Sequence, residues 1–211
     1  MHIAILGYGA MGSALAKQFA ASGHSVLVGV RSPEKYQDGP VGVRIVSLSA
    51  AARSASVVVL ATPHAAAAEI LRDAGAAEGA FAQKVLIDIT NPLTPDYQGL
   101  TIGRTDSGAE QIARLLPDTR VVKAFNTVFA QVLAQGPVFG AVHAQVFYAG
   151  DDTEANRIVH TLIADLGFVP IPAGPLKNAR YLEPLAGLNI FLGYGLGRGT
   201  QIVPHFLDRA T

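Results

Sequence analysis

Short apolar runs alternate along the chain with longer stretches in which apolar residues recur at helical spacing. The short runs are rich in Val and Ile and are apolar at successive positions, which is typical of strands covered on both faces. We expect strands at Ile3–Leu6, Val26–Val30, Val43–Val46, Val57–Ala61, Val85–Ile89, Val121–Ala124 and Val146–Ala149, and a last short strand at Phe168–Ile171.

Helical spacing separates several of these runs. We expect helices at Met11–Ser22, Ala65–Ala74, Ala109–Leu116 and Glu154–Leu166. Ser107 stands three residues before Glu110, which is the spacing of a capping box at a helix start. Strands alternating with helices indicate βαβ units. The pattern therefore predicts an α/β protein with a Rossmann-type, doubly wound, mostly parallel sheet.

The pattern changes after the turn at residues 173–175. Asn178–Leu196 is mostly apolar and predicts a helix or a pair of helices, followed by a tail of about fifteen residues. We therefore divide the chain into a nucleotide-binding domain, residues 1–174, and a C-terminal helical segment, residues 175–211, that packs on it as one structural unit. This segment either packs on the sheet only, or also lines a site or a homodimer contact.

Composition narrows the class of protein. Lys and Arg together number 16, as do Asp and Glu, so the balanced charge gives no reason to expect a nucleic-acid or membrane partner. The absence of cysteine excludes disulfides, thiolate metal ligands and cysteine nucleophiles, and no metal-binding motif is present. The apolar segment Leu185–Leu196 is shorter than the roughly 20 residues that span a bilayer. We expect a soluble, cytoplasmic protein.

A glycine-rich turn follows the first expected strand and opens the first helix. Its residues are Gly7, Tyr8, Gly9, Ala10, Met11 and Gly12, which match G-x-G-x-x-G. The first glycine permits the tight turn, the second lets the backbone approach a diphosphate, and the third lets the helix pack on the strand. In this βαβ context the turn predicts a dinucleotide site at the helix N-terminus.

The end of the second strand carries positive charge where NAD-binding proteins have an acidic residue. Val30 lies 18 residues beyond Gly12 and cannot bind ribose hydroxyls. Arg31 can hold a 2′-phosphate through two hydrogen bonds, Ser32 can donate another, and Lys35 adds a charge. This corner favours NADP(H) over NAD(H).

Polar side chains follow three further strands. Ala61, Thr62, Pro63 and His64 end the fourth strand, where ligands of open α/β sheets bind. His64 is the candidate catalytic residue: it can contact the nicotinamide or donate a proton, or it can only cap the following helix.

The ends of the fifth and sixth strands add Asn91 and the sequence Ala124, Phe125, Asn126. Phe125 can wall the pocket, and the two asparagines can bind the cofactor or an acceptor. Either asparagine can equally serve only to shape its turn.

Several motifs together carry a family resemblance over nearly the whole chain. They are GYGAMG, VGVRSPEK, DITNPL, SGAEQIARLLP, VVKAFNT and ARYLEPLAGLNI, in this order. With them the chain resembles the NADP oxidoreductase, coenzyme F420-dependent family, and also the cytosolic domain of six-transmembrane metalloreductases. The resemblance implies a homodimer that transfers hydride between NADPH and a deazaflavin, coenzyme F420.

The resemblance also implies roles for individual residues. It places residues 8–11 on the diphosphate, Arg31, Ser32 and Lys35 on the 2′-phosphate, and the strand-end residues Thr62, His64, Asn91, Ala124 and Asn126 around the nicotinamide and acceptor. Where archaeal members often have Pro-Trp, this chain has Pro63-His64, near the acceptor. A flavin or another small acceptor such as a quinone or imine is therefore an alternative.

Two other classes of protein are alternatives to an F420-dependent NADP oxidoreductase. Pyrroline-5-carboxylate reductases and hydroxyacid dehydrogenases build their substrate site from a large helical C-terminal domain, whereas only 37 residues follow Gly174 here. An NADPH sensor without turnover would keep the glycine turn and Arg31 but would need no acceptor pocket.

Overall fold

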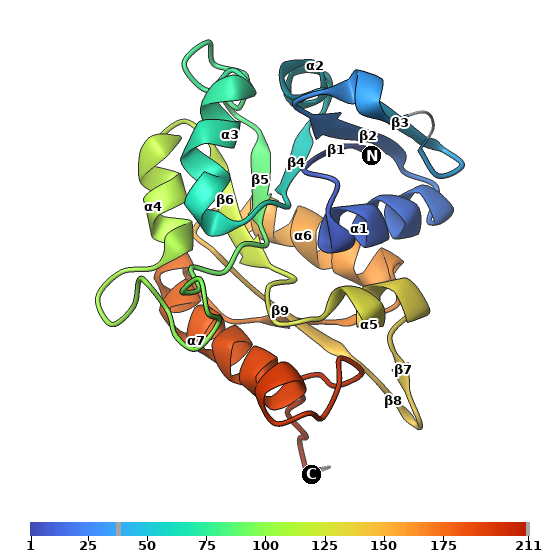
Figure 1. Ribbon diagram of the computed structural model, residues 1–211, viewed down its shortest axis with the longest axis vertical. Helices are drawn as coiled ribbons and strands as arrows, with labels where there is room; N and C mark the ends of the chain where they lie inside the picture. The colour runs from blue at the N-terminus through green and yellow to red at the C-terminus, as the bar shows by residue number, and fades with distance from the viewer. Residues whose placement is uncertain (37–38, 210–211) are drawn as a thin grey trace.

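The computed structural model describes residues 1–36 and 39–209 and has a central eight-stranded sheet between two layers of helices (Figure 1). The strand order is β10-β9-β6-β5-β4-β1-β2-β3. The strands are β1 His2–Leu6, β2 Ser25–Val30, β3 Val43–Ser47, β4 Val57–Leu60, β5 Val85–Asp88, β6 Arg120–Ala124, β9 Gln145–Gly150 and β10 Val169–Pro172. Within this eight-stranded sheet, only the pairing of β6 with β9 is antiparallel. The Rossmann-type, mostly parallel sheet is confirmed.

Helices cover both faces because successive residues of each strand point to opposite sides. In β1, Ile3 and Ile5 pack with one layer and Ala4 and Leu6 with the other. The helices are α1 Ala10–Ala21, α2 Leu48–Ser54, α3 Ala67–Asp73, α4 Gly108–Leu115, α5 Ala130–Gln135, α6 Thr153–Asp165 and α7 Ala179–Ile190. Helices α1, α5 and α6 form the first layer, and α2, α3 and α4 form the second.

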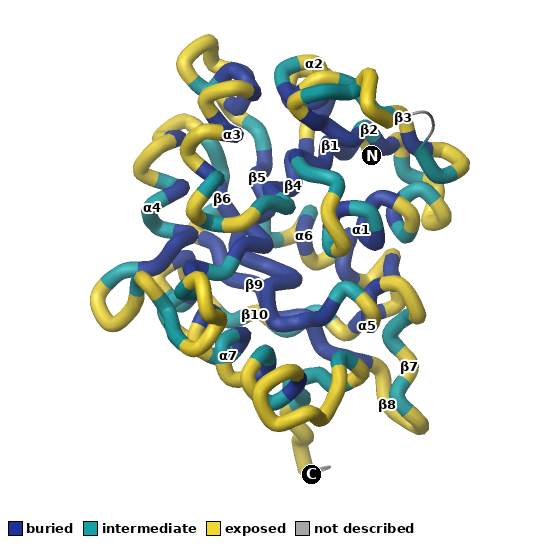
Figure 2. Tube along the Cα trace, in the orientation of Figure 1, coloured by how far each residue is buried: buried dark blue, intermediate teal, exposed yellow. Residues whose placement is uncertain are grey.

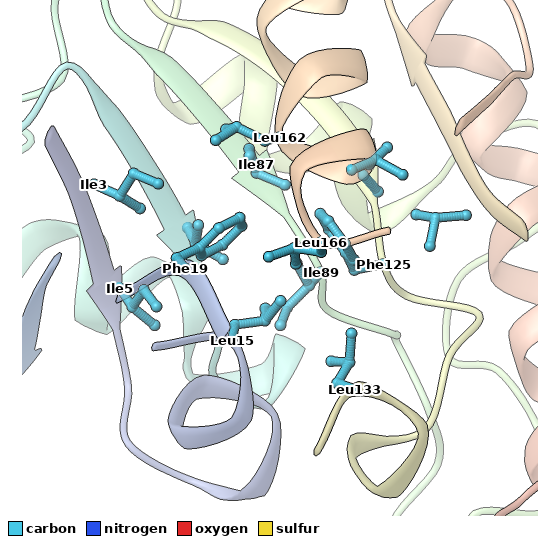
Figure 3. Close-up of a cluster of buried hydrophobic side chains, with 14 of the residues drawn as sticks. Ile3, Ile5, Leu15, Phe19, Ile87, Ile89, Phe125, Leu133, Leu162 and Leu166 are labelled. Atoms are coloured by element: carbon cyan, nitrogen blue, oxygen red, sulfur yellow. The ribbon is translucent and has the colours of Figure 1, made fainter. Parts of the chain in front are cut away.

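The core of the first layer is shown in Figure 3, where side chains from α1, α6 and the strands meet. Phe19 of α1 contacts Phe125 edge to face, with ring centroids 6.4 Å apart. Such aromatic pairs add to the free energy gained from burial alone.

Three elements were not expected from the sequence. Helices α2 and α5 are only two turns or less, and the hairpin of β7 Val138–Phe139 with β8 Val142–His143 has two-residue strands. Helix α2 begins at Ser47, whose hydroxyl accepts a hydrogen bond from the Ala50 amide at 3.3 Å. Elements this short hold too few residues to show a hydrophobic period.

The C-terminal segment forms α7, which runs on into a π-helical turn, η4 Phe191–Gly195, within the range where the apolar pattern predicted a helix or a pair of helices. Leu182 of α7 packs on Phe147 and Ala149 of β9. Figure 2 shows the buried strands and the mostly exposed turn and tail that follow α7. Within residues 1–36 and 39–209, no helix has both the length and the apolarity required to cross a membrane.

Candidate active site

The glycine turn is constrained on one side and open on the other. Gly7 has φ 111°, and a Cβ there would lie 2.4 Å from the Ala61 carbonyl oxygen. A Cβ at Gly12 would lie 2.2 Å from the Gly7 carbonyl oxygen, whereas a Cβ at Gly9 would meet nothing within 4 Å. No side chain caps α1 at Gly9, so the amides of its first turn can bind a ligand. This cradle fits a diphosphate.

The positive corner lies at the end of β2, as predicted. Arg31 and Lys35 are exposed, and the Ser32 hydroxyl makes no capping hydrogen bond to the short helix η1 Pro33–Lys35. Tyr8 of the glycine turn contacts Tyr36 edge to face, with centroids 5.5 Å apart. The glycine turn thus contacts the residue that directly follows η1.

A pocket of about 580 Å³ extends from the glycine turn across the carboxyl ends of β4 and β5. It brings together eight of the seventeen predicted cofactor residues, namely Gly9, Ala10, Met11, Ala61, Thr62, Pro63, His64 and Asn91. The Thr62 hydroxyl is buried and has no hydrogen-bond partner among the described residues. An unpaired hydroxyl here suits a polar ligand, because burying it alone costs free energy.

A second pocket, of about 230 Å³, adjoins the first and shares Met11 and Asn91 with it. Asn91 and Asn126 form its polar wall: Asn91 Nδ2 donates to the Asn126 carbonyl at 2.9 Å, and Asn126 Nδ2 donates to Asn91 Oδ1 at 3.0 Å. In the described part of the chain, Asn126 Oδ1 and Thr127 Oγ1 are buried without partners. Asn126 Oδ1 can accept a hydrogen bond from a carboxamide, and the Thr127 hydroxyl can accept or donate one.

Ala124 and Phe125 do not lie in the pocket wall where they were expected. Both are fully buried, and Phe125 packs on Phe19 in the core (Figure 3). Phe125 has φ 58°, a left-handed conformation that is uncommon for residues with a side chain. This turn sends Phe125 inward and places Asn126 at the pocket.

His64 stands at the start of the short helix η2 His64–Ala66, half buried. Its Nδ1 lies 3.2 Å from Thr90 Oγ1, which fixes the ring beside the end of β5. A Cβ at Gly108 would lie 2.9 Å from His64 Nδ1, so the ring packs tightly on the first turn of α4. The histidine is therefore held in place while it lines the larger pocket.

Behind His64 lies a cluster of three fully buried charged residues, Asp88, Lys123 and Glu183. Lys123 Nζ donates to Asp88 Oδ2 at 2.8 Å, to the Thr90 carbonyl at 2.5 Å and to Glu183 Oε1 at 2.9 Å. These three acceptors satisfy all three ammonium hydrogens. Because Asp88 and Lys123 are neighbours in the β5–β6 ladder, sheet register brings them together.

Glu183 connects α7 to this cluster and to α4. Its Oε2 accepts from the Gly108 amide at 2.9 Å, and its Oε1 accepts from the Ala109 amide at 3.1 Å. A carboxylate at a helix N-terminus is favoured by the free amides and by the helix dipole. The C-terminal helix therefore supports the backbone that carries Thr90 and Asn91.

Arg180 and Glu110 form a second link between α7 and α4. Arg180 Nε donates to Glu110 Oε2 at 2.8 Å, and a guanidinium Nη donates to Oε1 at 2.6 Å. Ser107 caps α4 as predicted, accepting from the Glu110 amide at 3.2 Å. The Arg180 hydrogen bond, opposed by partial burial and assisted by Ser107, holds the pKa of the Glu110 carboxyl below its usual range.

Some pocket residues were missed by the sequence analysis, mainly Tyr97, Thr127, Phe129, Asn189 and Tyr194. Thr127 directly follows Asn126, so its position after β6 was a usable signal. Asn189 lies on α7 within the motif ARYLEPLAGLNI, whereas Tyr97, Phe129 and Tyr194 lie in loops or on η4 and outside the family motifs. Their contact with the pocket depends on the packing of distant segments.

The family model for NADP oxidoreductase, coenzyme F420-dependent, matches residues 2–92. The chain is 32% identical to the F420-dependent NADP reductase of Methanothermobacter thermautotrophicus, over 91% of this chain and 89% of that protein. It is also 32% identical to metalloreductase STEAP3 of Rattus norvegicus, over 87% of this chain, but it spans only 36% of that relative's length.

Solved structures agree with these sequence relatives. A crystal structure of a candidate F420-dependent NADP-reductase from Arthrobacter sp. FB24 superimposes with a TM-score of 0.85 at 34% identity, over 95% of this chain and 96% of the other. Since both the full-length archaeal relative and this structure match nearly from end to end, the chain belongs to the NADP oxidoreductase, coenzyme F420-dependent family.

Proposed function

We propose that the protein is an NADPH-dependent oxidoreductase that transfers hydride between NADP(H) and a deazaflavin, coenzyme F420, or a flavin-like acceptor. The observation that carries this proposal is the pair of adjoining pockets that share Ala10, Met11, Ile89, Asn91 and Tyr97. One pocket begins at the dinucleotide turn, and the other opens beyond the strand ends. Hydride transfer requires two ligands held next to each other in a fixed orientation, which this arrangement allows.

Different groups of residues are proposed to bind different parts of NADPH. The turn Gly7–Gly12 would hold the diphosphate with its backbone amides, and Arg31, Ser32 and Lys35 would hold the 2′-phosphate. Thr62, Asn91 and Asn126 would bind the nicotinamide end through the polar atoms they present to the two pockets. When bound, NADPH supplies the hydride, and the protein supplies binding and orientation.

His64 is the proposed proton donor. Its contact with Thr90 Oγ1 and its packing against Gly108 hold the ring at the rim of the larger pocket. Reduction of a neutral acceptor by hydride requires one proton, and an imidazole held at the pocket can donate it when protonated. His64→Asn should lower kcat more than it raises the dissociation constant of NADPH.

We further propose a cytoplasmic homodimer. Support for self-association comes from large exposed apolar side chains around the end of α7, including Leu188, Phe191 and Leu196. The absence of cysteine is compatible with a reducing compartment. Sedimentation analysis of the purified protein tests the dimer, and cell fractionation tests the compartment.

We also propose that residues 1–174 and 175–211 unfold together as one unit. The buried contacts of Glu183 and the Arg180–Glu110 pair cross the boundary between them. A single calorimetric transition, with equal van't Hoff and calorimetric enthalpies, is expected.

The decisive experiment is NADPH oxidation with coenzyme F420, FMN, FAD and a quinone offered in turn. We expect turnover with F420 or a flavin, together with tight NADPH binding measured by calorimetry. Tight NADPH binding without turnover of any acceptor would refute the oxidoreductase and leave an NADPH-binding module. Preference for NADH would refute the assignment of the β2 corner.

A further inference from the structure

The loop between β5 and α4 contains a tight turn that presents a tyrosine. Leu93 and Leu100 form an isolated antiparallel bridge that closes this turn. Inside it, the Thr94 amide donates to the Gly99 carbonyl at 2.8 Å, and the Gly99 amide donates to Thr94 Oγ1 at 3.0 Å. The segment 93–100, which we call the tyrosine loop, is thus held by its own hydrogen bonds.

Asp96 stiffens the tip of the tyrosine loop. Its Oδ1 accepts from Thr94 Oγ1 at 2.5 Å and from the Gln98 amide at 3.1 Å. These two hydrogen bonds lower the pKa of the Asp96 carboxyl below its usual range. Tyr97 stands between Asp96 and Gln98 in the sequence, and its backbone amide donates to the Thr94 carbonyl at 2.9 Å.

Tyr97 is unusual in both backbone and side chain. Its φ is 59°, in the left-handed region that residues other than glycine, asparagine and aspartate rarely adopt. The residue nevertheless remains 64% exposed, so burial of the ring does not explain the conformation. Strained residues of this kind concentrate at ligand sites. Tyr97 lines both pockets of the candidate active site and a third hollow of about 480 Å³ beyond them.

Tyr194 also lines that hollow. It belongs to the π-helical turn η4 and lines the second pocket and the third hollow together with Tyr97. Its ring contacts Phe129 edge to face, with centroids 5.6 Å apart, yet the residue is 66% exposed. A Cβ at Gly193 would lie 2.8 Å from Phe129 Cζ, so the turn is packed firmly beneath Tyr194.

We infer that Tyr97 and Tyr194 form an aromatic clamp for a planar heteroaromatic acceptor, which stacks between them next to the nicotinamide pocket. The inference rests on the proposed function and defines its acceptor class: fused, flat ring systems such as deazaflavins and flavins, rather than small carbonyl compounds or imines. Flat π-systems gain from offset stacking on aromatic side chains, and a small aliphatic substrate would leave both rings without a partner.

The chain has no tryptophan, so a single introduced indole can serve as a fluorescent probe. Tyr97→Trp and, separately, Tyr194→Trp each place one indole in the clamp. The matched control is Tyr181→Trp, since Tyr181 is 74% exposed on α7 and lines none of the three hollows. FMN and coenzyme F420 are titrated into each variant with NADP⁺ present.

We expect saturable quenching of the indole at positions 97 and 194 and only weak, linear quenching at 181. Equal, non-saturating quenching at all three positions would overturn the clamp. This readout needs no turnover, so a protein that quenches in this way but transfers no hydride would refute the proposed function and leave the clamp standing.

Kinetics with the active protein give the second test. Tyr97→Ala and Tyr194→Ala should each raise the KM for the acceptor about tenfold or more, the range for loss of one stacked aromatic partner, with the dissociation constant of NADPH unchanged. Tyr97→Phe should restore the wild-type KM because the stacking face is kept, and Tyr181→Ala should have no effect. Unchanged acceptor KM in both alanine variants, with turnover intact, would overturn the clamp but not the proposed function.

Exposed tyrosines also occur in subunit contacts, and the same variants separate the two roles. Sedimentation should give one oligomeric state for wild type, Tyr97→Ala and Tyr194→Ala. A loss of self-association in either variant, with the acceptor KM recovering at high protein concentration, would assign these side chains to a subunit interface and overturn the clamp.

Discussion

The guanidinium of Arg31 lies 3.6 Å from the carboxylate of Glu69, and both side chains are at least half exposed, at 57% and 50%. Exposed pairs of this kind contribute little to stability, so Arg31 can exchange its partner at low cost. The 2′-phosphate of NADPH is a stronger partner because it offers more charge and bidentate geometry. The Glu69 carboxylate therefore keeps the Arg31 guanidinium near the proposed phosphate site but binds it weakly enough for the phosphate to replace it.

Arg31→Ala should weaken NADPH binding by about 1.5–3 kcal/mol, the range for hydrogen bonds to charged groups, and leave NADH binding nearly unchanged. Calorimetric titration with both nucleotides measures the difference. Arg157→Ala, which removes an exposed arginine paired with Glu154 on α6, is the control. Equal losses for NADPH and NADH would show that Arg31 does not bind the 2′-phosphate.

Glu69→Gln should have the opposite effect. Removing the negative charge beside Arg31 frees the arginine and removes repulsion of the phosphate, so NADPH should bind about two- to fivefold more tightly at low salt. The gain should shrink as ionic strength rises, since exposed charges are screened. Weaker NADPH binding in this variant would mean that Glu69 positions Arg31 rather than competing for it. Glu154→Gln serves as the control.

Two glycines of the glycine turn are expected to have different roles, one in nucleotide binding and the other in the stability of the fold. Gly9 has φ −75° and ψ −170°, which suit alanine, and its missing Cβ faces open space. Gly9→Ala should therefore keep the melting temperature and weaken NADPH and NADH alike, by tenfold or more, because the methyl group occupies the approach of the diphosphate.

Gly12→Ala should instead destabilise the fold by about 1–3 kcal/mol, because its methyl group would collide with the Gly7 carbonyl. Thermal unfolding and nucleotide titration of both variants make the comparison. A Gly9→Ala variant with unimpaired nucleotide affinity would remove the diphosphate from this turn.

The Glu110–Arg180 pair predicts a pH dependence of stability. Because the folded pKa of Glu110 is lowered by the Arg180 hydrogen bond, its stabilisation is fully present above the unfolded pKa and is lost as pH falls through the folded pKa. Glu110→Gln should lower the free energy of unfolding by about 1–2 kcal/mol at pH 7. The difference from wild type should shrink below about pH 4.5.

Denaturant unfolding between pH 3 and pH 7 measures this dependence. Glu154→Gln breaks a pair of exposed side chains and should change stability less at every pH. A difference between wild type and Glu110→Gln that stays constant across the pH range would contradict the assignment of the stabilisation to the ionised Glu110.

The sequence predicted those parts of the site that follow from local pattern and sheet order. The glycine turn, Thr62 to His64 and Asn91 meet in one pocket because parallel strands end at the same edge. The prediction was wrong for the side chain of Phe125. A left-handed residue turns the chain after β6, and no sequence signal showed that the ring faces Phe19.

Contacts between distant segments account for the rest. Lys123 was recognised within a family motif, but its partners lie 35 residues before it and 60 residues after it. Tyr97 and Tyr194 line a common hollow because the tyrosine loop and η4, which are far apart in the sequence, border the same space. The pattern of apolar and polar residues does not show which distant residues come into contact. Those contacts depend on how the helices pack on the sheet.

The buried cluster around Lys123 limits how the molecule can be divided. A fragment that ends at Gly174 would retain the glycine turn and the whole positive corner, yet it would lack Glu183. Lys123 would lose one of its three acceptors, and the amides of Gly108 and Ala109 would lose theirs. Leaving buried charges and amides without partners is costly. We therefore do not expect the nucleotide-binding domain, residues 1–174, to fold when it is moved into another protein by itself. A chimera built from this chain must carry α7 together with the glycine turn.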